Sequence, residues 1–137
     1  MGDRSNIVIE SSDKSRIYLY SHWGGERVIE SAVHGASSCR TDDAPYLARI
    51  IAQHMYRNES LDADTGYGIS AYPTDNEHPY IVFTEDGNVH FEAEDGTRLT
   101  KPVRGIEFVE HVTSIDDWQG RADQDVLYDI VIKQIGN

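Results

Sequence analysis

The chain has 137 residues, a hydrophobic share of 39%, a charged share of 26% and a formal net charge of −12. Its length is typical of one domain, and its composition is that of a folded globular protein rather than a disordered one. The charge is uneven: residues 1–60 carry seven basic and eight acidic side chains, whereas residues 61–137 carry five and sixteen. This excess repels phosphate backbones, which argues against direct nucleic-acid binding and favours a protein partner with a basic surface.

Three further features lead us to expect a cytoplasmic protein. Residues 1–6 lack the basic region and apolar run of a signal peptide, and no apolar run approaches the ~20 residues that a membrane helix needs. The single cysteine, Cys39, cannot form an internal disulfide, which fits a reducing compartment. We expect Cys39 to be an inert, small hydrophobic residue.

The first third of the chain predicts a β-hairpin followed by two helices. Apolar residues alternate over residues 7–9 and 17–20, on either side of a turn-rich stretch at residues 11–15. A first helix is expected over about residues 26–37. A second, over about residues 43–57, has Asp42 or Asp43 as a cap, Pro45 in its first turn, and an apolar stripe formed by Leu47, Ile50, Ile51 and Met55.

The middle of the chain changes to a β pattern. Strands are expected over residues 67–73 and 80–84, the second of them buried on both faces. Asp86 and Gly87 form a two-residue turn favoured in hairpins, and a returning strand follows over residues 89–93. In that strand His90 lies on the face opposite Val89, Phe91 and Ala93, where we expect it to be exposed.

The last third is ambiguous by periodicity. Residues 105–115 suit a helix slightly better than a strand, whereas residues 126–135 combine β-branched content with a length that permits a helix. We therefore predict an α+β fold in which an antiparallel sheet built from hairpins is covered by two consecutive helices. Residues 1–137 form one domain in this prediction, with residues 105–137 either part of it or a C-terminal extension joined through residues 120–123.

No stretch of the chain carries a signature that names a reaction. The six histidines are scattered without metal-ligand spacing, and one cysteine cannot complete a structural zinc site. Residues 62–66 open like a calcium loop, but Tyr67 and Pro73 occupy positions that require glycine and glutamate. Acidic pairs are frequent in so acidic a chain, and no nucleophile elbow is present. We expect no cofactor, no metal and no catalytic residues, with a hydrolase using scattered His and Asp residues as a third interpretation.

Three groups of residues are candidates for binding. An aromatic strand end opens into a glycine turn at His22 and Trp23, and a polar loop connects two β segments at Asp75, Asn76, Glu77 and His78. Polar and aromatic loops on a rigid sheet recognise partners or ligands. The acidic second half of the chain adds Asp116 and Asp117, with Asp123, Asp125 and Asp129 nearby in sequence.

Four segments together are similar to a family of small uncharacterised proteins encoded by actinobacterial phages and prophages. They are YLYSHWGG at residues 18–25, DAPYLARII at 43–51, TGYGIS at 65–70 and DNE at 75–77. The resemblance covers roughly residues 5–93, and the segment beyond residue 100 looks like an addition. It implies a phage protein that acts in the cytoplasm of a bacterial host, and it brings no established activity.

The sequence thus favours a non-enzymatic, acidic binding protein. Its expected partner is a host or phage macromolecule with a basic groove, and inhibition of a host defence or regulatory protein is one concrete form. The alternative is a small-molecule or nucleotide-binding module, with the His22–Trp23 turn and the loop from Asn76 to His78 as pocket walls. An acidic surface that only keeps the protein soluble is the simplest interpretation of the charge. The oligomeric state is left open.

Overall fold

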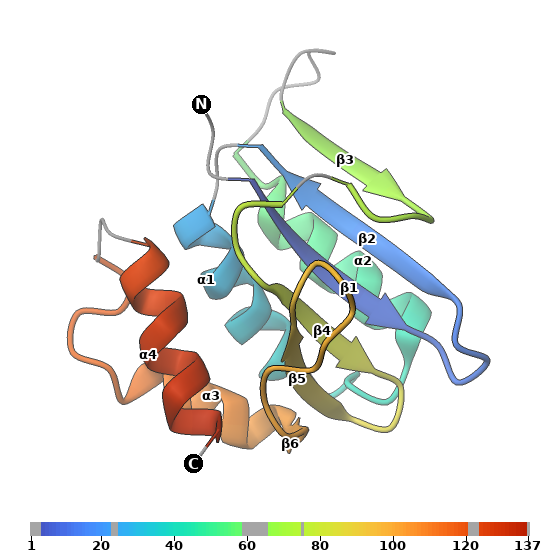
Figure 1. Ribbon diagram of the computed structural model, residues 1–137. Helices are drawn as coiled ribbons and strands as arrows, with labels where there is room; N and C mark the ends of the chain where they lie inside the picture. The colour runs from blue at the N-terminus through green and yellow to red at the C-terminus, as the bar shows by residue number, and fades with distance from the viewer. Residues whose placement is uncertain (1–3, 23–24, 59–65, 75, 121–123, 137) are drawn as a thin grey trace.

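A computed structural model describes residues 4–22, 25–58, 66–74, 76–120 and 124–136 of the chain. Within these residues, six strands form one sheet in the order β3-β2-β1-β4-β5-β6, accompanied by four helices (Figure 1). The strands are β1 (Ser5–Glu10), β2 (Arg16–Ser21), β3 (Tyr67–Ser70), β4 (Tyr80–Thr84), β5 (Asn88–Glu92) and β6 (Val103–Arg104). The helices are α1 (Gly25–Ala36), α2 (Ala44–Met55), α3 (Gly105–Thr113) and α4 (Gln124–Gly136).

The predicted α+β class is confirmed, and the sheet is mostly antiparallel. Strands β1 and β2 form the expected hairpin, with Ile7 opposite Leu19, and β4 and β5 form another, with Ile81 opposite Phe91. One pair differs from a sheet made of hairpins alone, because β1 and β4 run parallel. The chain leaves β2, forms α1 and α2, adds β3 at the edge and returns on the other side of β1. A parallel pair requires such a long crossover connection.

Helix α2 has the local structure that its sequence predicts. Asp43 is the N-cap, and its carboxylate accepts a hydrogen bond from the backbone N–H of Tyr46. A proline stands in the first turn, where its missing N–H costs no hydrogen bond. Leu47, Ile51 and Met55 are buried on one face of the helix, which packs closely against α1.

The C-terminal third is helical, as slightly favoured for residues 105–115 and left undecided for residues 126–135. In α4, one buried stripe at helical spacing consists of Leu127, Tyr128, Val131 and Ile135. These residues belong to the same hydrophobic core as residues of α1, α2, α3 and the sheet. Burial of this stripe accounts for the helix despite the β-branched content, because tertiary packing outweighs intrinsic propensity.

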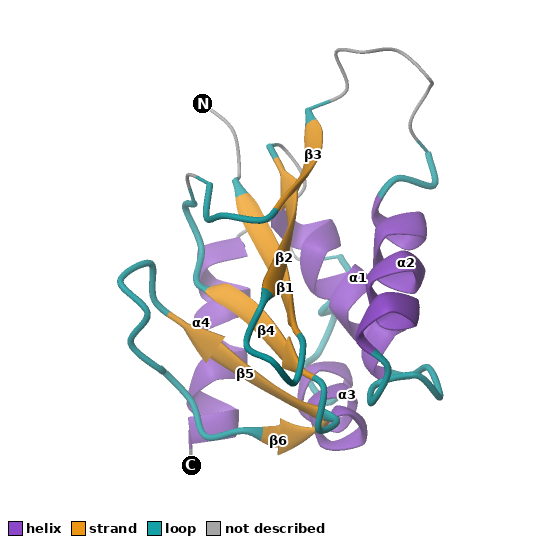
Figure 2. Ribbon diagram, turned by 90° about the vertical axis from the view of Figure 1, so that its right-hand side faces the viewer, coloured by secondary structure: helices purple, strands orange, loops and turns teal. Residues whose placement is uncertain are grey.

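The sheet has two different faces because side chains alternate along each strand. One face carries Ile7, Ile9, Ile81, Phe83, Val89 and Phe91, which share the main core with the helices. The other face holds a smaller apolar cluster of Val8, Tyr18, Tyr80 and Val82, next to a group of charged side chains. Figure 2 shows the sheet from the side, with α1 and α2 on one side of β1 and β2.

Two observations bear on the expectations about the surface. Cys39 is exposed and lies in the connection between α1 and α2, and its expected inertness stays a prediction. Among the described residues, no helix combines the length and apolar character needed to cross a membrane.

Candidate functional site

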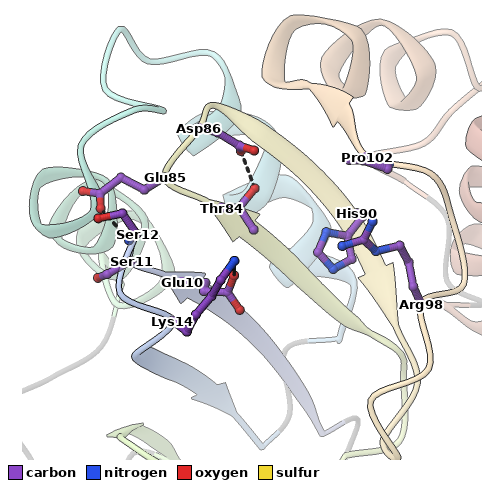
Figure 3. Close-up of a pocket in the computed structure, with 10 residues that line it drawn as sticks. All are labelled: Glu10, Ser11, Ser12, Lys14, Thr84, Glu85, Asp86, His90, Arg98 and Pro102. Atoms are coloured by element: carbon purple, nitrogen blue, oxygen red, sulfur yellow. Dashed lines mark hydrogen bonds and ion pairs between the residues drawn. The ribbon is translucent and has the colours of Figure 1, made fainter.

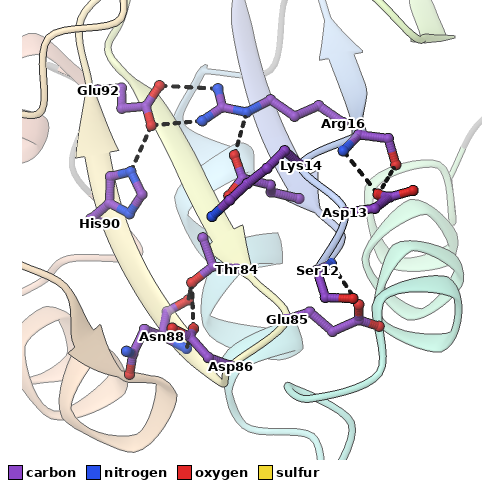
Figure 4. Close-up of polar contacts among 12 residues, drawn as sticks. Ser12, Asp13, Lys14, Arg16, Thr84, Glu85, Asp86, Asn88, His90 and Glu92 are labelled. Carbon is purple, nitrogen blue, oxygen red and sulfur yellow. Dashed lines mark hydrogen bonds and ion pairs between the residues drawn. The ribbon is translucent and has the colours of Figure 1, made fainter.

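A chain of charged side chains crosses the sheet face that does not share the main core. Arg16 lies at its centre, with Nε 2.8 Å from Oε1 of Glu10 on the neighbouring strand. Its Nη1 and Nη2 lie 3.0 and 2.8 Å from Oε1 and Oε2 of Glu92, which is a bidentate pair (Figure 4). His90 extends the chain, because its Nε2 lies 2.7 Å from Oε2 of Glu92.

The prediction that His90 is exposed is wrong. Strand alternation does place it opposite Val89 and Phe91, but its side chain is only 2% exposed. The segment after β5 folds back across this face: Arg98 pairs with Glu92 in an isolated antiparallel bridge, and Oγ1 of Thr100 accepts a hydrogen bond from the backbone N–H of Phe91. The sheet face is therefore covered by chain rather than by solvent at this end.

The charge states of this group follow from its contacts. Burial alone would raise the pKa of Glu92, but hydrogen bonds from Arg16 and His90 outweigh burial and hold that pKa below its ordinary value of 4.5. The hydrogen bond to Glu92 likewise raises the pKa of Arg16 above its already high ordinary value. Both groups are therefore ionised at neutral pH.

The tautomer of His90 is then determined. An ionised carboxylate can only accept hydrogen bonds, so Nε2 of His90 carries the proton that Glu92 accepts. In the neutral ring, Nδ1 keeps a lone pair. This atom is buried and has no hydrogen-bond partner among the described residues. A buried polar atom without a partner costs about 1–3 kcal/mol, so a donor brought to Nδ1 would be bound favourably.

His90 and Glu10 also line a pocket of about 450 Å³ (Figure 3). Such a volume is in the range of small-molecule sites. The other walls come from separate parts of the chain: residues 11, 12 and 14 of the first hairpin turn, residues 84–86 at the β4–β5 turn, and Arg98 and Pro102 after β5.

Hydrogen bonds to Glu85 hold two of these walls together. Its Oε1 accepts from the backbone N–H of Ser12 at 2.9 Å, and its Oε2 accepts from that of Ala44, the first residue of α2, at 3.0 Å. These bonds hold the pKa of Glu85 below its ordinary value. The first hairpin turn, the β4–β5 turn and α2 are thus tied to one carboxylate, so the pocket is formed without a ligand.

The pocket side chains differ in how many hydrogen bonds and ion pairs they already make within the protein. Oδ1 of Asp86 accepts from Oγ1 of Thr84 at 2.5 Å and from the backbone N–H of Asn88 at 3.2 Å. Lys14 is 82% exposed and lies 3.9 Å from Glu10, which is a weak pair. The side chain of Arg98 makes no hydrogen bond or ion pair within the described residues. The carboxylates are thus engaged, whereas one guanidinium is open to a ligand.

The structure describes only some of the residues predicted as pocket walls. His22 follows β2, with its Nδ1 2.8 Å from the hydroxyl of Tyr20, while Trp23 and Asp75 lie outside the described residues. His78 is buried and stacks on Tyr128 of α4, with ring centroids 4.5 Å apart. It therefore packs between the loop and α4.

Asn76 and Glu77 lie beside His78 at a hollow of about 220 Å³. Asn76 donates to the backbone carbonyl of His78, and the backbone N–H of Glu77 donates to the carbonyl of Arg4. These bonds fix the loop to the start of β1. The hollow is smaller than the pocket at His90, and it does not include His22.

Asp116 and Asp117 are exposed in the connection between α3 and α4. Further exposed carboxylates on the two helices are Glu107, Glu110, Asp125 and Asp129, and we call these six residues the α3–α4 acidic surface. Within the described part of residues 105–136, Lys133 is the one lysine or arginine. Six exposed carboxylates thus stand on α3, α4 and their connection, and one of them, Asp125, lies 3.2 Å from Nδ1 of His78.

One histidine cluster resembles a nucleophile and its base. Ser31 Oγ lies 2.8 Å from Nδ1 of His54, and Glu30 lies 4.0 Å from the other ring nitrogen. Ser31 is fully buried, however, and Nη1 of Arg57 lies 2.9 Å from the same Nδ1. Ser31 lines neither the pocket at His90 nor the hollow at residues 76–79, and the lone pair of the base is already used. The cluster joins α1 to α2, which gives no support to a hydrolase at this place.

The group of charged side chains on this sheet face was missed at the sequence level, although a signal was present. Glu10, Arg16, His90 and Glu92 all stand at positions of apolar strands that alternation assigns to one face. Charged residues gathered on one sheet face indicate either that this face is exposed to solvent or that it holds a buried polar network. Only the fold shows which, since the covering segment follows β5 in sequence. Among the described residues, no three His, Cys, Asp or Glu side chains are grouped in a way that could hold a metal ion.

Comparison of the chain with protein-family models, with curated proteins and with solved structures finds no match.

Proposed function

We propose that this chain is a non-enzymatic binding protein whose pocket at His90 takes a small polar molecule. The observation that carries the proposal is a pocket that is already formed and is lined by His90, whose buried Nδ1 lacks a hydrogen-bond partner among the described residues, and by Arg98, whose guanidinium is open. An unsatisfied acceptor held rigidly by Glu92 and Arg16 is suited to receive a donor from a ligand.

Binding rather than catalysis is supported by what surrounds this nitrogen. A base that activates a nucleophile lies within hydrogen-bond reach of it. Within the described residues no hydroxyl or thiol is bonded to Nδ1, and Oγ1 of Thr84 donates to Asp86 instead. The pocket thus provides groups that can hydrogen-bond a ligand, but the described residues provide no nucleophile paired with this base.

A thermal-shift screen with a library of polar metabolites tests this function. A ligand present at ~100 times its dissociation constant should add roughly 2.7 kcal/mol of stability. Amide chemical shifts measured by NMR then locate each ligand, and the proposal expects the largest changes at Ser12, Glu85 and His90. Exchange of His90→Gln keeps an N–H donor for Glu92 and should abolish the shift. Ligands that perturb only the hollow at residues 76–79, or a library without any ligand, would overturn the proposal.

A second candidate function is binding of a macromolecule with a basic surface. It is favoured by the α3–α4 acidic surface, whose six carboxylates have one lysine among them. Such a surface steers a basic partner over the ~8–10 Å reach of electrostatic interactions at physiological salt. The resemblance of residues 5–93 to phage proteins supports a partner in a bacterial host, and inhibition of a host regulator is one form of this proposal.

Affinity capture from bacterial lysate at low and high salt tests the second function. Asp116→Asn with Asp117→Asn removes two charges, and asparagine tolerates the left-handed backbone of Asp117, whose φ is 55°. Exchange of exposed Asp42→Asn is the matched control. The proposal expects one partner that is lost at high salt and in the double variant and is kept in the control. Capture that neither salt nor the double variant reduces would contradict it.

A further inference from the structure

The two sides of the pocket at His90 differ in charge. Figure 3 shows Glu85, Ser11 and Ser12 on one side, His90 and Arg98 on the other, and Asp86 at the β4–β5 turn. A ligand that fits both sides must carry chemically different groups at its two ends.

The side with Arg98 calls for an anion. Its guanidinium has five N–H donors and makes no side-chain contact within the described residues that would use them. Planar carboxylates bind to guanidinium groups through two parallel hydrogen bonds. Lys14, on the first hairpin turn, adds a second cation to the pocket lining and is held only weakly at 3.9 Å from Glu10.

The remaining open positions call for hydrogen-bond donors. Nδ1 of His90 presents a lone pair, and the carboxylates of Glu85 and Asp86 each have further lone pairs beyond the bonds they already accept. Hydroxyl groups can donate to all three. A purely apolar acid would leave these acceptors without partners.

The charge balance disfavours a second negative charge on the ligand. The ionisable side chains along the pocket include the acids Glu10, Glu85 and Asp86 and the bases Lys14 and Arg98. With acids in excess, each negative charge away from Arg98 is repelled by the β4–β5 turn, so a dianion such as a phosphate monoester meets more repulsion than a carboxylate.

Building on the proposed function, we propose that the ligand of this pocket is a small hydroxy-carboxylic acid. Its carboxylate pairs with Arg98, and its hydroxyl groups donate to Nδ1 of His90 and to the carboxylates of the opposite wall. This assignment names the ligand class and the residue that selects it, which is Arg98.

Four six-carbon probes separate charge from hydroxyl groups. Gluconate has a carboxylate and hydroxyls, sorbitol has hydroxyls alone, hexanoate has a carboxylate alone, and sorbitol 6-phosphate replaces the carboxylate with a dianion. Dissociation constants are measured by NMR titration with the intact chain. We expect gluconate to bind roughly ten-fold or more tightly than each of the other three, as loss of a hydrogen bond to a charged group implies.

The variant Arg98→Gln should remove this preference and bring gluconate close to sorbitol. Arg49→Gln is the matched control, because Arg49 is also an exposed arginine but lies on α2. Sorbitol binding as tightly as gluconate, with shifts at Ser12 and His90, would overturn the ligand class and leave the pocket function intact. Tightest binding of sorbitol 6-phosphate would overturn the class in the same way. Failure of all four probes overturns the class, and the metabolite screen then decides separately on the pocket function.

Discussion

Nε2 of His90 lies 2.7 Å from Oε2 of Glu92, and both side chains are buried on the sheet face that carries no part of the main core. The two residues stand at positions i and i+2 of β5, so their side chains point to the same face. This relationship directs the proton to Nε2 and leaves Nδ1 as an acceptor. It also makes Glu92 the link between a binding group and the stabilising pair with Arg16.

Replacement of Glu92→Gln should therefore destabilise the protein. Glutamine cannot form the bidentate ion pair, so Arg16 loses a charged partner in a largely buried place. We expect a loss of about 2–4 kcal/mol in the free energy of unfolding, measured by urea denaturation. Exposed Glu94→Gln, two residues beyond the end of β5, is the control and should change stability by less than about 0.5 kcal/mol. Equal stability of the two variants would show that the pair of Arg16 and Glu92 makes no net contribution to the free energy of unfolding.

Local features of the fold could be predicted from the sequence. The hairpin of β1 and β2 follows from alternation, and α2 follows from a cap, a proline and an apolar stripe that all agree. These signals act within a few residues. The helical state of residues 126–135 could not be decided in this way, because its determinant is the core that Tyr128 and Val131 contact from a distance in sequence.

The candidate site was less predictable for the same reason. Two bonds that hold the pocket walls join residues 12 and 85 and residues 44 and 85, and the neighbouring ion pair joins residues 16 and 92. Each pair is far apart in sequence, so no spacing rule can find it. Sequence reasoning selected loops that are rich in polar residues, and in one of them His78 stacks on Tyr128 of α4.

Replacement of His78 distinguishes a role in core packing from a role in ligand binding. His78→Ala removes a ring that is stacked on Tyr128 and only 3% exposed at its side chain. We expect a loss of about 2–4 kcal/mol in unfolding free energy, in the range of buried aromatic truncations. The neighbouring exposed variant Glu77→Ala should stay within about 0.5 kcal/mol of the wild type. A stable His78→Ala protein that no longer binds its ligand would instead assign His78 to a binding site.

The stability of the α1–α2 pair should depend on pH through His54. Burial, helped by the nearby charges of Arg57 and His34, lowers the pKa of His54 below its ordinary value of 6.5 in the folded state. The unfolded state then binds a proton more readily, so stability is fully present above about pH 6.5 and is lost as the pH falls through the lower folded pKa. His54→Gln removes this titration, so its unfolding free energy should fall less steeply between pH 7 and pH 5. A titration of the His54 ring followed by NMR checks the direction, and identical slopes in both proteins would contradict the assignment.

The close approach of α1 and α2 at Gly35 gives a last test of the fold. A Cβ built on Gly35 would lie 2.4 Å from Cγ1 and 2.6 Å from Cδ1 of Ile51, which is fully buried and has little room to move. Gly35→Ala gains up to about 1 kcal/mol of helix propensity, but overpacking costs about 1–3 kcal/mol, so we expect a net destabilisation. Ile51→Ala clears the space, and in that background Gly35→Ala should be neutral or stabilising. A double-mutant cycle in urea measures this coupling, and additive effects would mean that the two helices are further apart than the structure places them.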